Sequence, residues 1–137
     1  AGGVPAQARD VLSDLAAVNC PAGQAADALT VIATKYGLKS VSGVIERIAR
    51  RMDAILRALP AIADEARFRS GFGRRFTYYD GFVFETFGNG LSSKQPLASG
   101  GRYDGLIEGL SRARVSASGI GGVVRPDRIL RIRGGAS

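Results

Sequence analysis

Residues 74–85 read Arg-Arg-Phe-Thr-Tyr-Tyr-Asp-Gly-Phe-Val-Phe-Glu, and this stretch follows a change in composition at Phe68. A second stretch, residues 100–106, reads Gly-Gly-Arg-Tyr-Asp-Gly-Leu. Both combine tyrosine hydroxyls, fixed charges and glycines, a mixture typical of a small polar-ligand pocket. A guanidinium pairs with a carboxylate and a carboxylate pairs with an ammonium group, so such a pocket fits a zwitterion such as an amino acid. The alternative is that the tyrosines lie at the edge of a core and Glu85 is solvated.

Around these stretches the sequence predicts strands in place of helices. Residues 76–87 alternate as in a strand, so we expect only one of Tyr78 and Tyr79 to line a given pocket. The pair Asp80-Gly81 fits either a hairpin turn or a β-bulge, and the length of the flanking strand favours the bulge. A return strand at 97–99 and a helix over 103–112, with Leu106, Ile107 and Leu110 inward, are expected next. A strand over 116–124 and a last helix from Pro126 follow.

The first half of the chain predicts helices. Apolar residues recur at helical spacing over 5–18, 24–36 and 43–58. The segment Asn19 to Gly23 breaks the first helix, and Gly37 suits the end of the second. Pro60 ends the third, with helical character resuming through 61–67. A helical segment (1–68) followed by a strand-rich segment (69–137) predicts an α+β fold with an antiparallel sheet.

Bulk composition excludes several classes of protein. The chain has 137 residues, 45% hydrophobic and 23% charged, which suits one globular domain, expected to be part of a longer chain. No apolar run is long enough for a membrane helix. With no histidine and one cysteine, zinc sites and histidine-based triads are excluded within this chain. Because Cys20 has no internal partner, we expect a reducing, cytoplasmic location.

The net charge of +7 comes mainly from arginine. Basic charge of this size indicates nucleic acid, nucleotide phosphates or an acidic partner surface. The arginines are scattered, however, and only the tail from Arg125 to Arg133 is dense. We therefore expect solvated charge and protein contacts, with no nucleic-acid partner and no membrane partner.

Residues 74–85 resemble the histidine-specific motif of class II histidyl-tRNA synthetases, Arg-Gly-Leu-Asp-Tyr-Tyr-Thr-Gly-x-Val-Phe-Glu. The matching positions are Arg74, Tyr78, Tyr79, Gly81, Val83, Phe84 and Glu85. Residues 100–106 match the companion motif Gly-Gly-Arg-Tyr-Asp-Gly-Leu throughout. The resemblance covers residues 70–130 well and implies part of a class II synthetase-like antiparallel sheet with flanking helices. By this resemblance the histidine-binding residues are Arg74, Tyr78, Tyr79, Glu85, Arg102 and Tyr103.

The chain departs from the family pattern at several positions. The synthetase aspartate before the tyrosine pair is Thr77 here, and the threonine after it is Asp80. A third segment resembles class II motif 3, whose arginine clamps ATP phosphates, and Arg128 fits that arginine. Arg125 and Pro126 stand where the family gives ATP room. The resemblance therefore implies a degenerate ATP site at Arg125 and Arg128, with no catalytic residue, cofactor or metal.

Among the families that share these motifs, a synthetase continues into an anticodon-binding domain, whereas this sequence ends nine residues after Arg128. The paralogous family without that domain comprises the regulatory subunits of ATP phosphoribosyltransferase, the first enzyme of histidine biosynthesis. Resemblance to it implies a non-catalytic subunit with the catalytic subunit as partner, histidine as effector, and a homodimer within a hetero-oligomer. The first alternative is a fragment of a catalytic histidyl-tRNA synthetase. The second is a basic RNA-binding or interaction domain.

Overall fold

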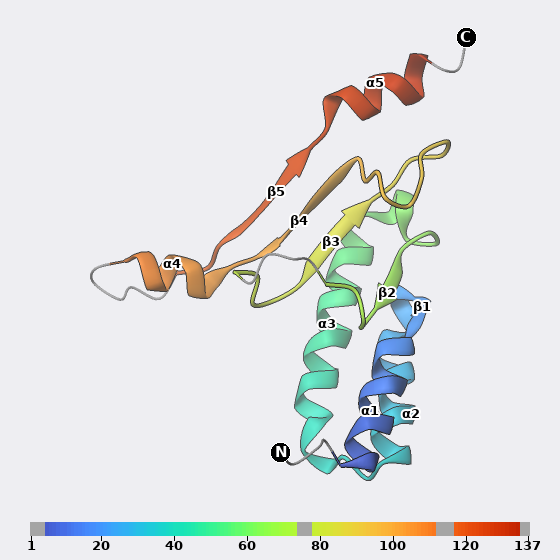
Figure 1. Ribbon diagram of the computed structural model, residues 1–137, viewed down its shortest axis with the longest axis vertical. Helices are drawn as coiled ribbons and strands as arrows, with labels where there is room; N and C mark the ends of the chain where they lie inside the picture. Colours follow the sequence, from blue (N-terminus) through green and yellow to red (C-terminus); the bar gives the residue numbers. More distant parts are fainter. Residues whose placement is uncertain (1–4, 74–77, 112–116, 135–137) are drawn as a thin grey trace. The chain divides into compact units, whose positions relative to one another are not determined.

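The computed structural model describes residues 5–73, 78–111 and 117–134 (Figure 1). The chain divides into two compact units, Ala1–Phe72 and Gly73–Ser137. Helices and two small antiparallel sheets make up the described residues, so the expected α+β class is confirmed. Among the described residues no helix has the length and apolar character needed to cross a membrane.

The first unit is mainly helical. It holds α1 (Ala6–Ala17), α2 (Ala25–Lys35) and α3 (Ser42–Ala58), with short 3-10 turns η1 (Ala22–Gln24), η2 (Lys39–Val41) and η3 (Pro60–Ile62). Its buried apolar residues are Ala22, Ala25, Leu29 and Ile32, on η1 and α2. After α2 the chain turns at Gly37, whose φ of 66° is a conformation that glycine adopts without steric cost. The three expected helices are therefore confirmed to within two residues at each end.

A two-stranded ribbon in this unit was not predicted. Strand β1 (Asn19–Pro21) pairs antiparallel with β2 (Arg67–Arg69), and Asn19 lies opposite Arg69. The Arg67 side chain reinforces the ribbon, because its Nε donates to Asn19 Oδ1 at 2.9 Å. The sequence-based prediction of helical character through 67 was wrong. A strand of three residues has no measurable period, and its partner lies more than 40 residues away in the sequence.

An exposed ion pair joins α1 to α2. Lys35 Nζ lies 2.7 Å from Asp14 Oδ2, and the Tyr36 hydroxyl donates to the same oxygen at 2.9 Å. Hydrogen bonds from Lys35 and then from Tyr36 lower the pKa of Asp14 below its usual 3.8. The hydrogen bond with Asp14 in turn raises the pKa of Lys35 above its usual 10.5.

The second unit contains a three-stranded antiparallel sheet with the order β3-β4-β5. Its strands are β3 (Val83–Thr86), β4 (Ala98–Arg102) and β5 (Ile120–Val124), with α4 (Asp104–Leu110) between β4 and β5 and α5 (Pro126–Gly134) after β5. Figure 1 shows α4 and α5 at opposite ends of the two long strands. Gly101 in the central strand lies opposite Val83 on one side and Gly121 on the other.

Two expectations for this unit need correction. The strand expected over 76–87 is limited to Val83–Thr86, because residues 78–82 form a turn and a bulge; residues 76 and 77 lie outside the described part. Of the three residues expected inward in the helix, Ile107 is half-buried, but Leu106 is 39% exposed and Leu110 is 76% exposed. A helix of seven residues has only two turns, and Ile107 is the residue whose side chain packs over Gly119.

The buried centre of the second unit consists mostly of backbone. Its buried residues in the described segments are Pro96, Ser99, Gly100, Gly101 and Gly119. Because four of these residues lie on the strands or immediately before β5, the middle of the sheet has almost no side-chain volume. Aromatic rings therefore lie directly on the strands, and these rings form the candidate site.

Candidate functional site

Three tyrosines cluster on one face of the sheet in the second unit. The ring centroids of Tyr78 and Tyr79 are 4.4 Å apart, and the ring of Tyr103 lies 6.1 Å from the first and 6.4 Å from the second. The hydroxyl of Tyr78 donates to that of Tyr79 at 3.2 Å. These distances are typical of interacting aromatic pairs. We call Tyr78, Tyr79 and Tyr103 the tyrosine cluster.

The expectation that only one of Tyr78 and Tyr79 lines a given pocket was wrong. It assumed strand alternation, but the ladder of β3 and β4 continues past Val83 in an irregular way. Arg102 donates its N–H to the Phe82 carbonyl at 2.9 Å and accepts the N–H of Asp80 at 3.1 Å. Asp80 and Phe82, which flank Gly81, thus both bond to the backbone of Arg102, as in the β-bulge that the sequence favoured.

The floor of the tyrosine cluster is a pair of glycines. Gly101 and Gly121 lie opposite each other in β4 and β5. A Cβ on Gly101 would lie 2.7 Å from Tyr79 Cδ1, and a Cβ on Gly121 would lie 2.8 Å from Tyr103 Oη. Real Cβ atoms essentially never make such close contacts. The glycines are therefore required for the rings to rest on the strands.

A second glycine pair serves the opposite face. Gly100 lies opposite Gly122, and the ring of Phe84 covers both, with its Cε1 2.9 Å from a Cβ placed on Gly100. Consecutive strand residues face opposite sides, so Phe84 and the tyrosine cluster lie on different faces of the sheet. Gly100 thus lies under the ring of Phe84 on one face of the sheet, and Gly101 lies under the ring of Tyr79 on the other.

Two aspartates join the segments that carry the tyrosines. The Asp80 carboxylate accepts the backbone N–H groups of Asp104, at 3.1 Å, and of Gly105, the first two residues of α4. Asp104 Oδ1 in turn accepts the N–H of Gly119 at 2.9 Å. The two motif stretches are therefore connected directly, and both are connected to the residue before β5.

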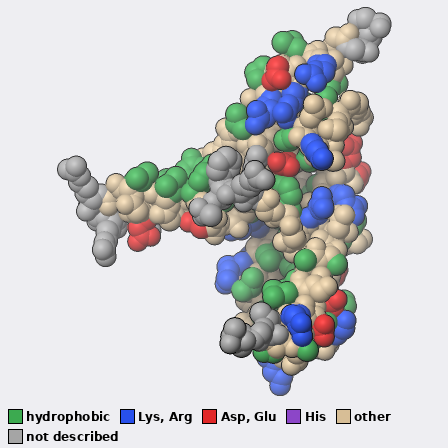
Figure 2. All heavy atoms as spheres, viewed as in Figure 1, with side chains coloured by type: hydrophobic (Ala, Val, Ile, Leu, Met, Phe, Trp, Pro, Cys, Tyr) green, Lys and Arg blue, Asp and Glu red, His purple; other side chains and the backbone are tan. Residues whose placement is uncertain are grey.

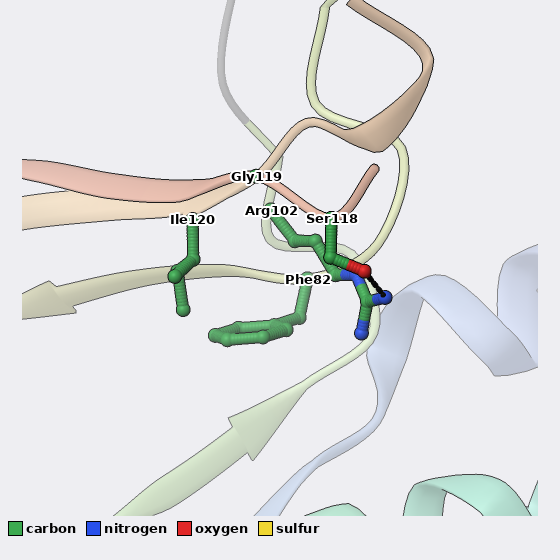
Figure 3. Close-up of a pocket in the computed structure, with 5 residues that line it drawn as sticks. All are labelled: Phe82, Arg102, Ser118, Gly119 and Ile120. Carbon is green, nitrogen blue, oxygen red and sulfur yellow. Dashed lines mark hydrogen bonds between the residues drawn. The ribbon is translucent and has the colours of Figure 1, made fainter. Parts of the chain in front are cut away.

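Arg102 lies apart from the tyrosine cluster. It is opposite Ile120 in the register, which places it on the Phe84 face of the sheet. Its Nε donates to Asp104 Oδ2 at 2.7 Å, and its Nη2 donates to Ser118 Oγ at 3.0 Å. Arg102 lines a small hollow of about 160 Å³ together with Phe82, Ser118, Gly119 and Ile120. Figure 3 shows these five residues and the bond from Arg102 to Ser118. The structure does not bring Arg102 together with Tyr79 and Tyr103.

Glu85 shares the face of the tyrosine cluster. It follows Val83 by two residues in β3, and Val83 lies opposite Gly101, on which Tyr79 rests. Glu85 itself is half-buried and lies opposite Ser99. Ser99 is only 2% exposed, and its hydroxyl has no hydrogen-bond partner in the described part of the chain. Glu85 therefore lies about 7 Å along the strand from the glycine floor, because each residue advances a strand by about 3.3 Å.

The two arginines expected at a degenerate ATP site both make hydrogen bonds within the chain, Arg125 through its backbone and Arg128 through its side chain. The N–H of Arg125 donates to the Leu97 carbonyl at 2.8 Å, which extends the β4-β5 ladder by one residue. Arg128 Nη1 donates to the Pro96 carbonyl at 2.6 Å, which anchors α5 to the segment before β4. Arg125 is half-buried, and its Nε has no hydrogen-bond partner among the described residues. The Arg128 guanidinium is thus bound to backbone.

Arg74, the remaining predicted histidine-binding residue, lies outside the described residues. Sequence reasoning did not predict that Phe82 and Ser118 line a hollow with Arg102. It assigned Asp80 to a turn or bulge and to a departure from a motif, but not to a helix cap, although an aspartate accepting N–H groups at a helix start is a known capping arrangement. The sequence does not show that Asp80 lies close to the start of α4 in space, because the two are more than 20 residues apart along the chain.

The charge on the surface is dispersed. In the view of Figure 2, Lys and Arg side chains form several separate groups with acidic and apolar side chains between them. The described residues contain no group of three or more His, Cys, Asp or Glu side chains able to hold a metal ion. We therefore take the tyrosine cluster as the candidate ligand site.

The comparison with known families agrees with the two motifs. The model of the family described as histidyl-tRNA synthetase matches residues 1–127. The chain belongs to the histidyl-tRNA synthetase family. The motif resemblance is thus confirmed, and the match to this family includes the helical unit, which the motifs alone did not cover. No solved structure matches the chain significantly.

Similar members of the histidyl-tRNA synthetase family carry two different names. An ATP phosphoribosyltransferase regulatory subunit of Chelativorans sp. (strain BNC1) is 38% identical over 127 residues, 93% of this chain and 33% of the relative. One of Mesorhizobium japonicum is 39% identical over 123 residues, 89% of this chain and 31% of the relative. A histidine–tRNA ligase of Borreliella burgdorferi is 38% identical over 95 residues, 67% of this chain and 20% of the relative. The chain spans about a third of the length of the regulatory subunits it matches.

Proposed function

We propose that this chain is part of a non-catalytic regulatory subunit of ATP phosphoribosyltransferase. The subunit assembles with the catalytic subunit in the cytoplasm, is needed for its activity, and transmits feedback inhibition by histidine in the first step of histidine biosynthesis. It forms a homodimer within the hetero-oligomer and needs no cofactor. Support comes from two relatives of that name, which match about nine tenths of this chain.

The structural observation that carries the proposal is the bond from Arg128 to the Pro96 carbonyl, at 2.6 Å. An arginine that clamps a nucleotide phosphate must direct its N–H groups at the phosphate oxygens. The Arg128 guanidinium instead directs one N–H group at the backbone carbonyl of Pro96. The tyrosine cluster, in contrast, shares a face of the sheet with Glu85. This arrangement suits an amino-acid site that is retained while the nucleotide site is lost.

A retained amino-acid site without adenylation acts as a sensor. A ligand that binds one of two conformations better shifts the equilibrium between them, and the shift is limited by the difference in affinity. We propose that histidine contacts Arg74, Tyr78, Tyr79, Glu85 and Tyr103. Arg102 holds Asp104 and thereby the backbone next to Tyr103.

The second candidate function is catalysis by a histidyl-tRNA synthetase. Both motif stretches are present, and the Borreliella burgdorferi ligase is 38% identical over two thirds of the chain. Isotope exchange between pyrophosphate and ATP separates the candidates, with histidine present and the catalytic phosphoribosyltransferase chain absent. We expect no exchange above background; exchange at a rate typical of enzymes would reverse the assignment.

Assembly provides a positive test. The protein is co-expressed with a phosphoribosyltransferase catalytic chain from an organism that encodes both, and the complex is isolated by size exclusion. We expect co-elution, phosphoribosyltransferase activity that depends on this subunit, and inhibition by added histidine. Separate elution of the two chains at micromolar concentration would count against a regulatory subunit.

A further inference from the structure

We propose that Asp80 is a positioning residue for the tyrosine cluster, and that it acts by capping α4 from outside the helix. The inference rests on the proposed function for its ligand, histidine, but its structural part stands on the hydrogen bonds alone. Asp80 follows Tyr79 directly in the sequence, and Asp104 follows Tyr103 directly. The bond between Asp80 and the start of α4 therefore connects the two backbones that carry these tyrosines.

Helix α4 needs this cap. It has seven residues, and two of them, Gly105 and Gly109, are poor helix formers. Its N-cap residue, Tyr103, makes no capping hydrogen bond with its own side chain. The Asp80 carboxylate accepts the N–H groups of Asp104 and Gly105 in its place, and its negative charge is favourable at the positive end of the helix.

A second set of bonds carries the restraint to the glycine floor. Tyr103 donates its N–H to the Gly119 carbonyl at 2.8 Å, while Asp104 Oδ1 accepts the Gly119 N–H at 2.9 Å. A Cβ on Gly119 would lie 2.7 Å from Tyr103 Cε2, so this glycine also lies against the ring. Asp80 holds α4, the start of α4 holds Gly119, and the ring of Tyr103 is confined between them.

The helix itself offers a matched pair of variants. A Cβ on Gly105 would lie 2.8 Å from Asp80 Oδ2, whereas a Cβ on Gly109 meets nothing within 4 Å. Both G105A and G109A raise the helix propensity of α4 by the same residue change. Only G105A displaces the Asp80 carboxylate. A difference between the two variants therefore reports positioning and not the stability of the helix.

The first measurement is the near-ultraviolet circular dichroism of the 137-residue chain. The chain has no tryptophan and four tyrosines, three of which form the cluster, so this signal reports their packing. We expect G105A to lose most of the tyrosine signal while its far-ultraviolet spectrum stays unchanged, and G109A to keep both. Equal near-ultraviolet spectra for the two variants would overturn the proposal.

Two substitutions of aspartate extend the test. D80N is isosteric and keeps one acceptor oxygen, so we expect an intermediate loss of signal, and D80A should match G105A. The control is D127A, which removes an exposed aspartate from the first turn of α5 and does not touch the cluster. A D80A spectrum equal to that of D127A would also overturn the proposal, and this holds even if G105A does not fold.

The second measurement is inhibition by histidine in the complex with the catalytic subunit. We expect the half-inhibiting histidine concentration to rise by about tenfold in G105A and D80A, because the start of α4 is no longer held, and to stay unchanged in G109A. If histidine does not inhibit the wild-type complex while G105A still loses the tyrosine signal, the proposed function fails and the positioning role stands. If histidine inhibits all four proteins equally, the positioning role fails and the proposed function stands.

Discussion

Gly101 and Gly121 lie directly opposite each other in neighbouring strands, and each supports the ring of a different tyrosine. Tyr79 rests on the first glycine and Tyr103 on the second, so their ring centroids are 6.4 Å apart. The distance between the rings is thus fixed by the distance between two hydrogen-bonded strands. The pairing of β4 with β5 thus holds Tyr79 and Tyr103, which are distant in sequence, at a defined separation.

Replacing Gly101 by alanine is expected to destabilise the second unit by about 1–3 kcal/mol, the usual cost of overpacking a close contact. The new Cβ would lie 2.7 Å from Tyr79 Cδ1 and close to the Phe82 carbonyl oxygen. Urea unfolding followed by tyrosine fluorescence measures the change. Gly73→Ala is the control, since its Cβ meets nothing within 4 Å. Equal midpoints for the two variants would show that the strands can move apart to admit a side chain.

The variant Arg128→Met is expected to lower stability without changing nucleotide binding. The bond to the Pro96 carbonyl is lost, and a charge-assisted bond of this kind contributes about 1–3 kcal/mol. Thermal unfolding measures the loss, and titration with ATP measures binding. Arg131→Met removes an exposed charge from the same helix and serves as the control. A loss of ATP affinity at unchanged stability would assign Arg128 to a working phosphate site.

Acid is expected to weaken the contact between α1 and α2. Hydrogen bonds from Lys35 and Tyr36 hold the pKa of Asp14 below 3.8, so the folded state binds this proton less readily than the unfolded state. The contribution of the carboxylate is therefore present above pH 3.8 and is lost as the pH falls through the lowered pKa. Unfolding midpoints of wild type and Asp14→Asn, measured between pH 7 and pH 2, should differ at neutral pH and converge in acid. A constant difference between the two curves would contradict this assignment.

The 137-residue chain by itself is expected to bind histidine weakly or not at all. It spans about a third of the length of the regulatory subunits it matches, and Arg102 lies on the opposite face from the tyrosine cluster. Isothermal titration of the chain with histidine measures the affinity. A dissociation constant in the micromolar range would show that the described residues already form a complete pocket.

Local patterns in the sequence were enough to predict the three helices of the first unit, the family and the residues that form the tyrosine cluster. Helical periodicity is local, so α1, α2 and α3 could be predicted from the spacing of their own apolar residues. Glycine pairs next to tyrosines are a local pattern as well, and two such motifs in order were enough to identify the family without coordinates.

Which of these residues face one another depends on contacts that form only in the folded chain. The β1-β2 ribbon, the bulge at Gly81 and the cap from Asp80 to α4 all depend on partners distant in sequence. The position of Arg102 on the Phe84 face follows from a register that no single strand encodes. Hydrogen bonds between strands determine this register in space. The pattern of residues along one strand does not specify which residue of the neighbouring strand will pair with each of them.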